Sequence, residues 1–347
     1  MTTGYFDFCR FPLDRYPYIT LAHGGGGRLT QQLIDEIFKP AFQSSFLLQE
    51  KDGAILPMES HRLAMTTDSF VINPLFFRGG DIGQLAVTGV CNDLAMVGAE
   101  PRYLTVGFVL EEGFSIEKLI QITQSIARKA SEVGAQVVTG DTKVVERGKG
   151  DGIYIAMSAL GVVESETHIG PQHIETGDLI LVSGPIGRHG VAIMSERLSL
   201  GFETSLKSDC DHLWPRVQAL LREKVRIHAL RDLTRGGLAT GLIELAQTRQ
   251  LEFQIHDQLI PLDEAVRGAC ELLGLDPLYS ANEGTMALIV DPRDGQRCCE
   301  ILQSFDPQAC QVGEVLSQAE GRVRLQTAFE THYMLEKQSG EQLPRIC

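Results

Sequence analysis

The stretch PRYLTVGFVL at residues 101–110 decides the fold, because it reads as a β-strand that begins a strand, helix, strand series. It is rich in β-branched and aromatic residues, as is DGIYIAMSALGVV at 151–163. Between them, apolar residues recur at helical spacing over 115–133, with Ser115 in the N-cap position and Gly134 just beyond the end. The sequence therefore predicts an alternating α and β structure in the first half of the chain.

The second half resumes the alternation after a break. The polar, turn-rich segment 164–178 marks a domain boundary, and LILVSG at 179–184 predicts the first strand beyond it. Helices are predicted near 187–198, 211–223 and 237–247, and strands near 285–291 and 322–326. We expect two α+β domains of comparable size. The predicted boundaries are an N-terminal extension at 1–18, domains at 19–168 and 169–333, and a tail at 334–347.

Composition and charge are those of an ordinary globular protein. The chain has 347 residues, of which 43% are hydrophobic and 22% charged, a length that favours two domains. The formal net charge of −14 opposes binding to nucleic acid or to anionic membranes, because both attract positive surfaces. Charged residues interrupt any signal-peptide core near the start, and no later stretch is long enough to span a bilayer. We expect a cytoplasmic protein without nucleic-acid or membrane partners.

Eight cysteines are scattered along the chain without a C-x-x-C pair, which argues against a zinc site and against a disulfide framework. One of them, Cys347, is the last residue and follows the polar stretch EQLPRI. The commonest prenylation signal places its cysteine four residues from the end, so a lipid site is a weak interpretation. Taken alone, this cysteine is more often inert than reactive, and both alternatives remain open at this point.

A run of four glycines, Gly24, Gly25, Gly26 and Gly27, stands directly before an apolar helical pattern. Backbone N–H groups in such a loop can point at an anion, and the following helix N-terminus favours negative charge. The run is therefore a candidate phosphate cradle. It lacks the Lys and Ser/Thr of a P-loop and does not complete the dinucleotide-binding pattern, so a flexible linker is an equal alternative.

Several aspartates fall beside strand-like or small-residue segments, where α/β proteins form their sites. They are Asp52, Asp68, Asp93, Asp141 and Asp232. Any one of them is more often a turn residue or a helix cap. If they converge, two carboxylates about 4 Å apart repel by roughly 4 kcal/mol at an effective dielectric constant of about 20. Mg²⁺ reverses that cost and bridges to phosphate oxygens, so the set favours a metal–nucleotide site.

Two further residues are candidates for proton transfer. Lys143 lies two residues beyond Asp141, where it could clamp a phosphate or, with its pKa lowered by burial, move a proton. Glu283 precedes a predicted strand and could be its partner across the site. Spacing alone favours the simpler interpretation, a surface lysine and a loop carboxylate.

Seven stretches taken together resemble the HypE family of hydrogenase maturation proteins, the carbamoyl dehydratases. They are LAHGGGGR, TTDSFVI, NDLAMVGA, VVTGDTKVV, RDLTRGGLAT, ANEGT and the terminal PRIC, so the similarity runs from about residue 19 to the last residue. That family belongs to an ATP-binding superfamily with aminoimidazole ribonucleotide synthetase, selenophosphate synthetase and thiamine monophosphate kinase. The resemblance implies an α/β (α+β), two-domain, aminoimidazole-ribonucleotide-synthetase-like fold with a flexible C-terminal tail. It also implies a homodimer formed through the N-terminal domain, with Mg-ATP held between the domains.

The resemblance also implies a reaction on Cys347. HypF would place a carbamoyl group on its thiol, and ATP-dependent dehydration would turn the resulting thiocarboxamide into a thiocyanate. The cyano group would then pass to iron on the HypC–HypD scaffold, destined for the nickel–iron hydrogenase centre.

Individual roles follow at the positions that match the family, and they too are implied by the resemblance. Lys143 and Glu283 would be the proton-transfer pair. Metal ligands would be Asp52, Asp68, Asp93, Asp141 and Asp232, and the nucleotide would contact glycines 24–27, Asp68, Asn92, Asp141 and Thr142. One departure is Gly53, which follows Asp52 where the family usually has alanine.

Two other functions stay open. A small-molecule ATP-dependent kinase or synthetase of the same superfamily would not need the tail. A non-catalytic carrier would bear the thiol without consuming ATP. Selenophosphate synthetase is disfavoured, because Cys9 lies well before the glycine run and no reactive cysteine stands beside it.

Overall fold

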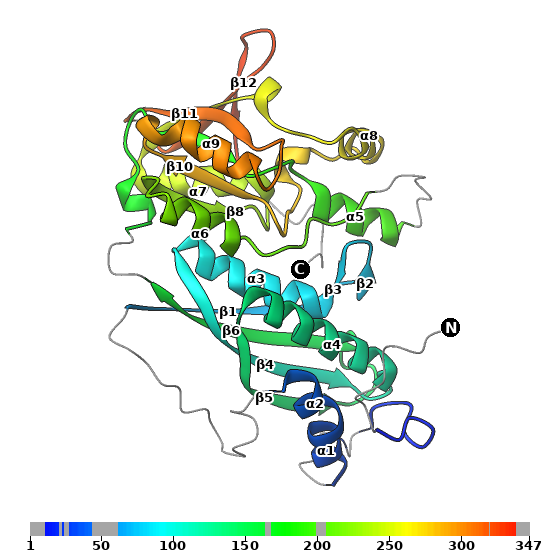
Figure 1. Ribbon diagram of the computed structural model, residues 1–347. Coiled ribbons are helices and arrows are strands. Elements are labelled where there is room, and N and C mark those ends of the chain that lie inside the picture. Colours follow the sequence, from blue (N-terminus) through cyan, green and yellow to red (C-terminus); the bar gives the residue numbers. More distant parts are fainter. Residues whose placement is uncertain are drawn as a thin grey trace.

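The chain folds into two α+β lobes, each built on its own sheet (Figure 1). The computed structural model describes residues 11–20, 23, 28–43, 62–163, 168–198, 206–318 and 320–337. The predicted sites at glycines 24–27, Asp52 and Cys347 lie outside the described residues. No helix in the described ranges is both long and apolar enough to cross a membrane.

The sheet of the N-terminal lobe has the order β1–β6–β4–β5. Its strands are Arg62–Phe70, Ile153–Val163, Ala99–Glu111 and Gln136–Val145 in that order. β6 is antiparallel to both β1 and β4, whereas β5 is parallel to β4. A parallel pair requires a crossover connection, and the helix predicted at 115–133 connects β4 to β5.

That helix is α4, Ile116–Val133. Ser115 accepts a hydrogen bond from the Lys118 N–H, and Gly134 ends the helix at a φ of 83°, so both predicted end signals are confirmed. β6, the predicted second strand, is confirmed as well, but it pairs antiparallel with β4. The parallel partner of β4 is β5, which follows α4 directly.

The described helices of this lobe cover one face of the sheet. α3 (Ile82–Met96) and α4 pack side by side on it, and the side chain of Asp81 caps α3 by accepting from two backbone N–H groups. A shorter helical run covers the β5 end, made of α1 (Arg28–Leu33), a π-helical turn (Ile34–Phe38) and α2 (Lys39–Phe42). A small hairpin of β2 (Phe76–Phe77) and β3 (Gly80–Asp81) precedes α3.

The sheet of the C-terminal lobe has the order β13–β12–β9–β11–β7–β10–β8. Among its described pairs, β12 and β9 are parallel and the others antiparallel. In chain order its strands are β7 Leu179–Val182, β8 Ile227–Asp232, β9 Leu251–His256, β10 Met286–Val290, β11 Cys310–Gln318, β12 Arg322–Gln326 and β13 His332–Leu335. β10 is buried along its whole length, which explains its uninterrupted apolar sequence MALIV.

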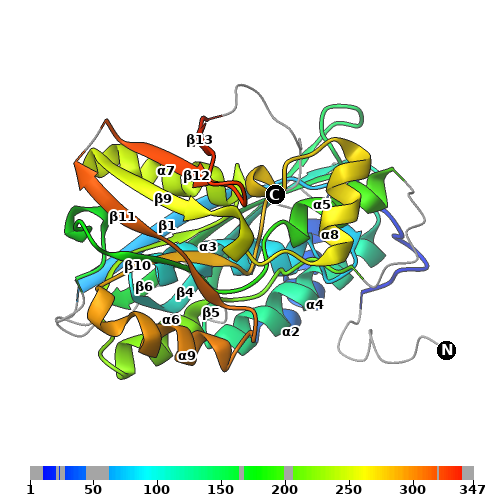
Figure 2. The same ribbon diagram turned by 90° about the horizontal axis from the view of Figure 1, so that it is seen from above.

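Helices cover both faces of this second sheet. Figure 2 shows α7 (Gly237–Arg249) on one side, and α6 (Trp214–Arg222) and α9 (Gly295–Gln303) on the other. α5 (Arg188–Arg197) and α8 (Glu264–Leu273) lie beside each other at the edge. Single 3₁₀ turns occupy Pro171–His173, Asp257–Leu259, Pro277–Tyr279 and Pro292–Asp294.

The helices and strands predicted for the second half are found as α5, α6, α7, β7, β10 and β12. β13 crosses the predicted start of the tail at residue 334, and the described chain continues to Lys337. α3 lies between the two lobes in Figure 1, and its last turn packs into the apolar core around α6 and α9. The junction between the lobes is therefore a packed interface.

Candidate active site

Glu283 is a buried carboxylate on a tightly held loop between the lobes. The side chain of Asp209 accepts hydrogen bonds from the N–H groups of Glu283 and Gly284, both at 3.1 Å, and from the hydroxyl of Thr285 at 3.0 Å. A Cβ at Gly284 would lie 1.8 Å from the Asp209 carbonyl oxygen, so only glycine fits there. The side chain and the backbone of Asp209 thus both hold the loop that carries Glu283.

The carboxyl group of Glu283 is poised to carry a proton. It is 3% exposed, and its Oε1 atom has no hydrogen-bond partner among the residues that the structure describes. Burial raises the pKa of Glu283 well above the usual range, and the nearby charges of Asp209, Asp232, Asp68 and Asp93 raise it further. A carboxylate with a raised pKa is a stronger base than an exposed one, and a protonated one is a usable acid.

Two of the surrounding aspartates are perturbed in the same direction. Burial raises the pKa of Asp93, to which the Thr66 hydroxyl donates a hydrogen bond of 2.7 Å. Burial, and then the charge of Asp93, raise the pKa of Asp232 to about 6. Arg231 opposes both shifts but does not cancel them. Burial thus disfavours the charged forms of both aspartates, and the carboxylates around them add to this effect.

The structure brings together Glu283 and three of the predicted aspartates from four different elements. Of the aspartates, only Asp232 lies at the end of a strand, β8, as the sequence suggested. Asp68 lies inside β1, two residues before its end, and Asp93 lies inside α3. The strand-like segment predicted to end at Asp68 thus continues to Phe70, and the small-residue segment around Asp93 is part of a helix.

Asp141, Thr142 and Lys143 lie elsewhere, in the middle of β5. β6 and β4 separate β5 from β1, so three inter-strand spacings, about 14 Å, lie between Asp141 and Asp68 across the sheet. Asp141 and Lys143 are exposed. A single chain therefore does not bring Lys143 beside Glu283.

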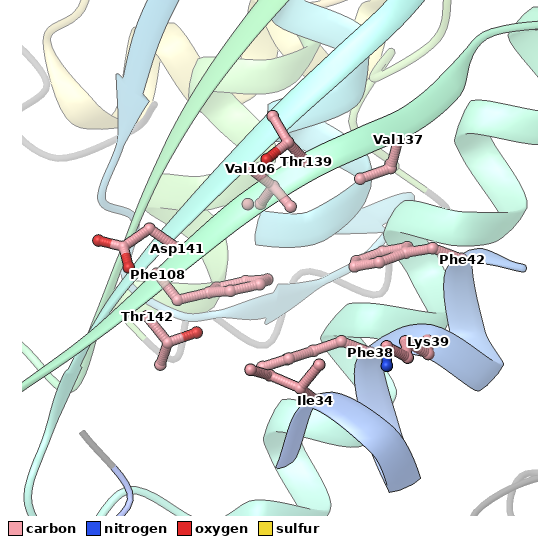
Figure 3. A pocket seen from close by; sticks show the side chains of 11 residues that line it. Ile34, Phe38, Lys39, Phe42, Val106, Phe108, Val137, Thr139, Asp141 and Thr142 are labelled. Carbon is pink, nitrogen blue, oxygen red and sulfur yellow. The ribbon is translucent and has the colours of Figure 1, made fainter. Parts of the chain in front are cut away.

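Asp141 and Thr142 instead border a pocket of about 170 Å³ between β5 and the helical run α1–α2 (Figure 3). The rings of Phe38 and Phe108 stack at 5.3 Å in its wall. Further apolar lining comes from Ile34, Phe42, Val106 and Val137, and polar groups from Lys39, Thr139, Asp141 and Thr142. A flat apolar ring with polar edges fits such a pocket.

Asn92, predicted to contact nucleotide, is fully engaged at the junction of the lobes. It is 2% exposed, and its amide nitrogen donates to the carbonyl oxygens of Asp211 and Glu283, both at 3.2 Å. Its amide oxygen accepts from the Leu213 N–H at 2.8 Å. These contacts fasten α3 to the C-terminal lobe and position the backbone of Glu283.

The donor set fits a magnesium ion that also binds phosphate. Within the described ranges, no three His, Cys, Asp or Glu side chains lie close enough to hold a metal ion by themselves. Mg²⁺ usually takes one or two carboxylates and completes its shell with phosphate oxygens and water. Burial is the largest cause of the raised pKa values of Asp93 and Asp232, and neighbouring carboxylates add to it, so a bound cation would favour their charged forms.

Sequence reasoning missed Asp209 and Arg231. Asp209 holds the Glu283 loop, and Arg231 moderates the charge of Asp93 and Asp232. Arg231 stands next to a predicted site residue, which was the available signal. Asp209 has no such signal, because its role depends on a segment far away in the sequence.

Comparisons with known proteins place this geometry in a family. Residues 50–163 match the model of the AIR synthase related protein N-terminal domain, and 175–326 match that of its C-terminal domain. The carbamoyl dehydratase HypE of Azotobacter vinelandii is 46% identical over 95% of this chain and 97% of its own.

Solved structures agree with the sequence comparison. A crystal structure of the hydrogenase maturation protein HypE in complex with ATP is 40% identical and covers 94% of this chain and 99% of its own, with a TM-score of 0.91. A HypE–HypF complex is 38% identical and covers 88% of this chain and 99% of the other, with a TM-score of 0.77. The chain belongs to the HypE family of carbamoyl dehydratases, within the AIR synthase related proteins.

Proposed function

We propose that this protein uses ATP to dehydrate a carbamoyl group carried on the thiol of Cys347. The product is a protein thiocyanate that supplies the cyanide ligand of the [NiFe]-hydrogenase iron. The observation that carries the proposal is the buried, proton-binding carboxyl of Glu283 set among Asp68, Asp93 and Asp232. The ATP complex of a relative and the name carbamoyl dehydratase borne by others support it.

The reaction needs a way to remove an amide oxygen, which is a poor leaving group. The carbamoyl oxygen attacks the γ-phosphorus of ATP in line, and the bond from that phosphorus to ADP breaks. The activated oxygen then departs as phosphate while the nitrogen loses its two protons, which leaves a carbon–nitrogen triple bond on sulfur. Glu283 accepts one of these protons, because burial raises its pKa and makes it a stronger base than an exposed carboxylate, and the departing phosphate takes up the other.

Mg²⁺ bound with ATP would neutralise the triphosphate and its developing charge. Asp68, Asp93 and Asp232 are its proposed ligands, joined by Asp52, which lies outside the described residues. The glycines at 24–27, also outside them, are proposed to cover the phosphates. The aspartates thus serve substrate binding, and Glu283 serves proton transfer.

The site is proposed to be completed by a second copy of the chain. Both edge strands of the N-terminal sheet, β1 and β5, lack a partner on their outer sides among the described strands. The sheet face opposite α3 and α4 carries solvent-exposed apolar side chains: Leu63 is 51% exposed and Met65 is 71% exposed. Pairing β5 of each copy with β1 of the other would close the sheets and bury this face.

Such a homodimer brings the β5 residues to the carboxylates. The partner's Lys143 would then be delivered to Glu283, and the partner's Asp141 and Thr142 to Asp68. The base of ATP would occupy the aromatic pocket of one copy, and its phosphates the carboxylates of the other. Within one chain, α3 and α4 fill the sheet face between these two places, so a nucleotide bound in the pocket has no open path across it.

Partners before and after this step follow from the same chemistry. HypF is proposed to load the carbamoyl group, in line with the HypE–HypF complex solved for a relative. The HypC–HypD scaffold is proposed to receive the cyano group. The proposed location of all three steps is the cytoplasm.

Mass spectrometry of the intact protein tests the proposal. After carbamoylation by HypF, the chain should lose one water on addition of Mg-ATP, and the change should map to Cys347. Cys347→Ala is the control, and it should bind ATP but carry no modification. Modification of that variant elsewhere, or no loss of water in the unsubstituted protein, would contradict the proposal.

The alternative function, a small-molecule ATP-dependent kinase or synthetase, is distinguished by deleting residues 338–347. Such an enzyme keeps full turnover of a diffusible substrate without this segment. The proposed dehydratase loses its substrate together with the segment, while ATP binding remains.

A further inference from the structure

The last described residues of the chain are fastened beside the site. The hydroxyl of Tyr279 donates a 2.8 Å hydrogen bond to the carbonyl oxygen of Glu336. The ammonium of Lys337 lies 3.5 Å from a carboxylate oxygen of Glu244, whose other oxygen pairs with Arg231. We call residues 336–337 the tail root.

Both anchors of the tail root are close in the chain, or through an ion pair, to segments that carry site carboxylates. Tyr279 lies four residues before Glu283, so at most about 14 Å of chain separates them. Glu244 pairs with Arg231, which directly precedes Asp232 in β8, so consecutive Cα atoms about 3.8 Å apart join this pair to Asp232.

The two anchoring regions are also packed against each other. A Cβ on Gly237, at the start of α7, would lie 2.6 Å from the carbonyl oxygens of Leu278 and Ser280. The loop that presents Tyr279 and the helix that presents Glu244 therefore form one rigid support for the tail root.

We propose that Tyr279 and Glu244 are positioning residues that hold the tail root beside the loops of Asp232 and Glu283. This inference rests on the proposed function. The segment that carries Cys347 therefore starts from a point close to the reaction site. Beyond the tail root the sequence has ten more residues, 338–347, and a chain of ten residues reaches at most about 35 Å.

Tether length sets the size of the effect. Without the anchors, β13 keeps its pairing with β12 at an edge of the sheet and the packing of Leu335 against the apolar core. If β13 also detaches, the tether grows from ten residues to sixteen, which are 332–347. The effective concentration of a tethered group falls with roughly the three-halves power of tether length, so it drops about twofold.

The test uses the full-length double variant Tyr279→Phe, Lys337→Gln. Hydrogen exchange of residues 332–337 in the unmodified protein should become faster, because the anchors are gone. After carbamoylation of Cys347, single-turnover dehydration should slow about twofold or more. The same substitutions in a Cys347→Ala background should leave the dehydration rate of an added S-carbamoyl-cysteine peptide unchanged, because that substrate is not tethered.

Tyr333→Phe is the matched control. Tyr333 lies on β13 and is 60% exposed, and no hydrogen bond of its hydroxyl occurs among the described residues. This variant should exchange hydrogen and dehydrate its own tail as the unsubstituted protein does.

Three results would overturn the positioning role alone, with dehydration by the unsubstituted protein intact. They are an unchanged tethered rate in the double variant, an equal slowing of the free peptide, and unchanged hydrogen exchange. An unsubstituted protein that fails to dehydrate its carbamoylated tail would instead refute the proposed function, and this inference with it.

Discussion

The two edges of the N-terminal sheet carry opposite halves of one proposed site. Asp68 on the β1 edge lies near Asp93 of α3 and near Asp232 and Glu283 of the C-terminal lobe. Burial raises the pKa of these three carboxyl groups, and the charge of Asp68 raises it further. The β5 edge holds Asp141 and Lys143 in the open, beside an aromatic pocket. The carboxylates at one edge are therefore already arranged for cations and protons within a single chain, whereas the residues at the other edge need a second chain to reach them.

The largest expected effect is on the dehydration rate, and co-expression of two variants tests whether the two edges act together in one site. Glu283→Gln and Lys143→Gln should each lower the dehydration rate by about a hundredfold or more, because each removes a proton-transfer group. Co-expressed, the two variants should recover about a quarter of the sites, since half of random dimers are mixed and each mixed dimer keeps one intact pair.

The co-expression result has a direct control. Met65→Glu on both chains places a charge on the proposed dimer face and should abolish the recovery, with monomers seen by light scattering. Lack of recovery in mixed dimers whose Met65 is unchanged would show that Glu283 and Lys143 do not act across two subunits.

The next effect concerns the free energy of unfolding of the nucleotide-free protein. The pKa of Asp232 is raised to about 6, roughly two units above the ordinary value of an aspartate. The folded protein then holds a proton that the unfolded chain has released, so stability is lost as the pH rises from about 4 to about 6. Asp232→Asn removes this loss and should stabilise the protein by up to about 3 kcal/mol above that range.

Urea unfolding at about pH 4 and about pH 8 checks this prediction. The free energy of unfolding of Asp232→Asn should differ little from that of the unsubstituted protein at the lower pH and should exceed it clearly at the higher pH. Asp141→Asn is the matched change on the β5 edge, and since Asp141 is exposed it should leave unfolding unchanged. Equal stability of Asp232→Asn and the unsubstituted protein at the higher pH would mean that Asp232 is not perturbed.

The smallest effect tests the support of one carboxylate on the β1 edge. Thr66→Val removes the 2.7 Å hydrogen bond to Asp93 and should weaken Mg-ATP binding by about tenfold, the value of one hydrogen bond to a charged group. Titration calorimetry measures it. Thr67→Val is the control, because Thr67 points to the other sheet face and bonds the carbonyl oxygen of Met157. An equal loss of Mg-ATP affinity in both variants would mean that the substitutions disturb β1 as a whole and not Asp93 in particular.

Local features of the fold were predictable from the sequence, and the arrangement of distant parts was not. α4 follows from its apolar spacing, its serine cap and its closing glycine, all of which act within a few residues. The strand order that sets β5 at the far edge from β1 is a long-range property, so adjacent motifs could not reveal that Asp141 and Asp68 lie apart.

The candidate site shows the same limit. The gathering of Asp68, Asp93 and Asp232 was expected from their residue types and contexts, and the structure brings them near Glu283. The role of Asn92 was not predictable, because its partners Asp211 and Leu213 come from a segment more than a hundred residues away. Side chains that hold two distant segments together leave no pattern in either one.

The segment 206–213 has a consequence for motion. It is fastened to the N-terminal lobe through the side chains of Asn92, Gln84 and Lys129, and its Asp209 grips the Glu283 loop. A hinge that opened the lobes like a clamshell would have to break these ties and carry the proton acceptor away from Asp93. These ties therefore favour turnover without separation of the two lobes.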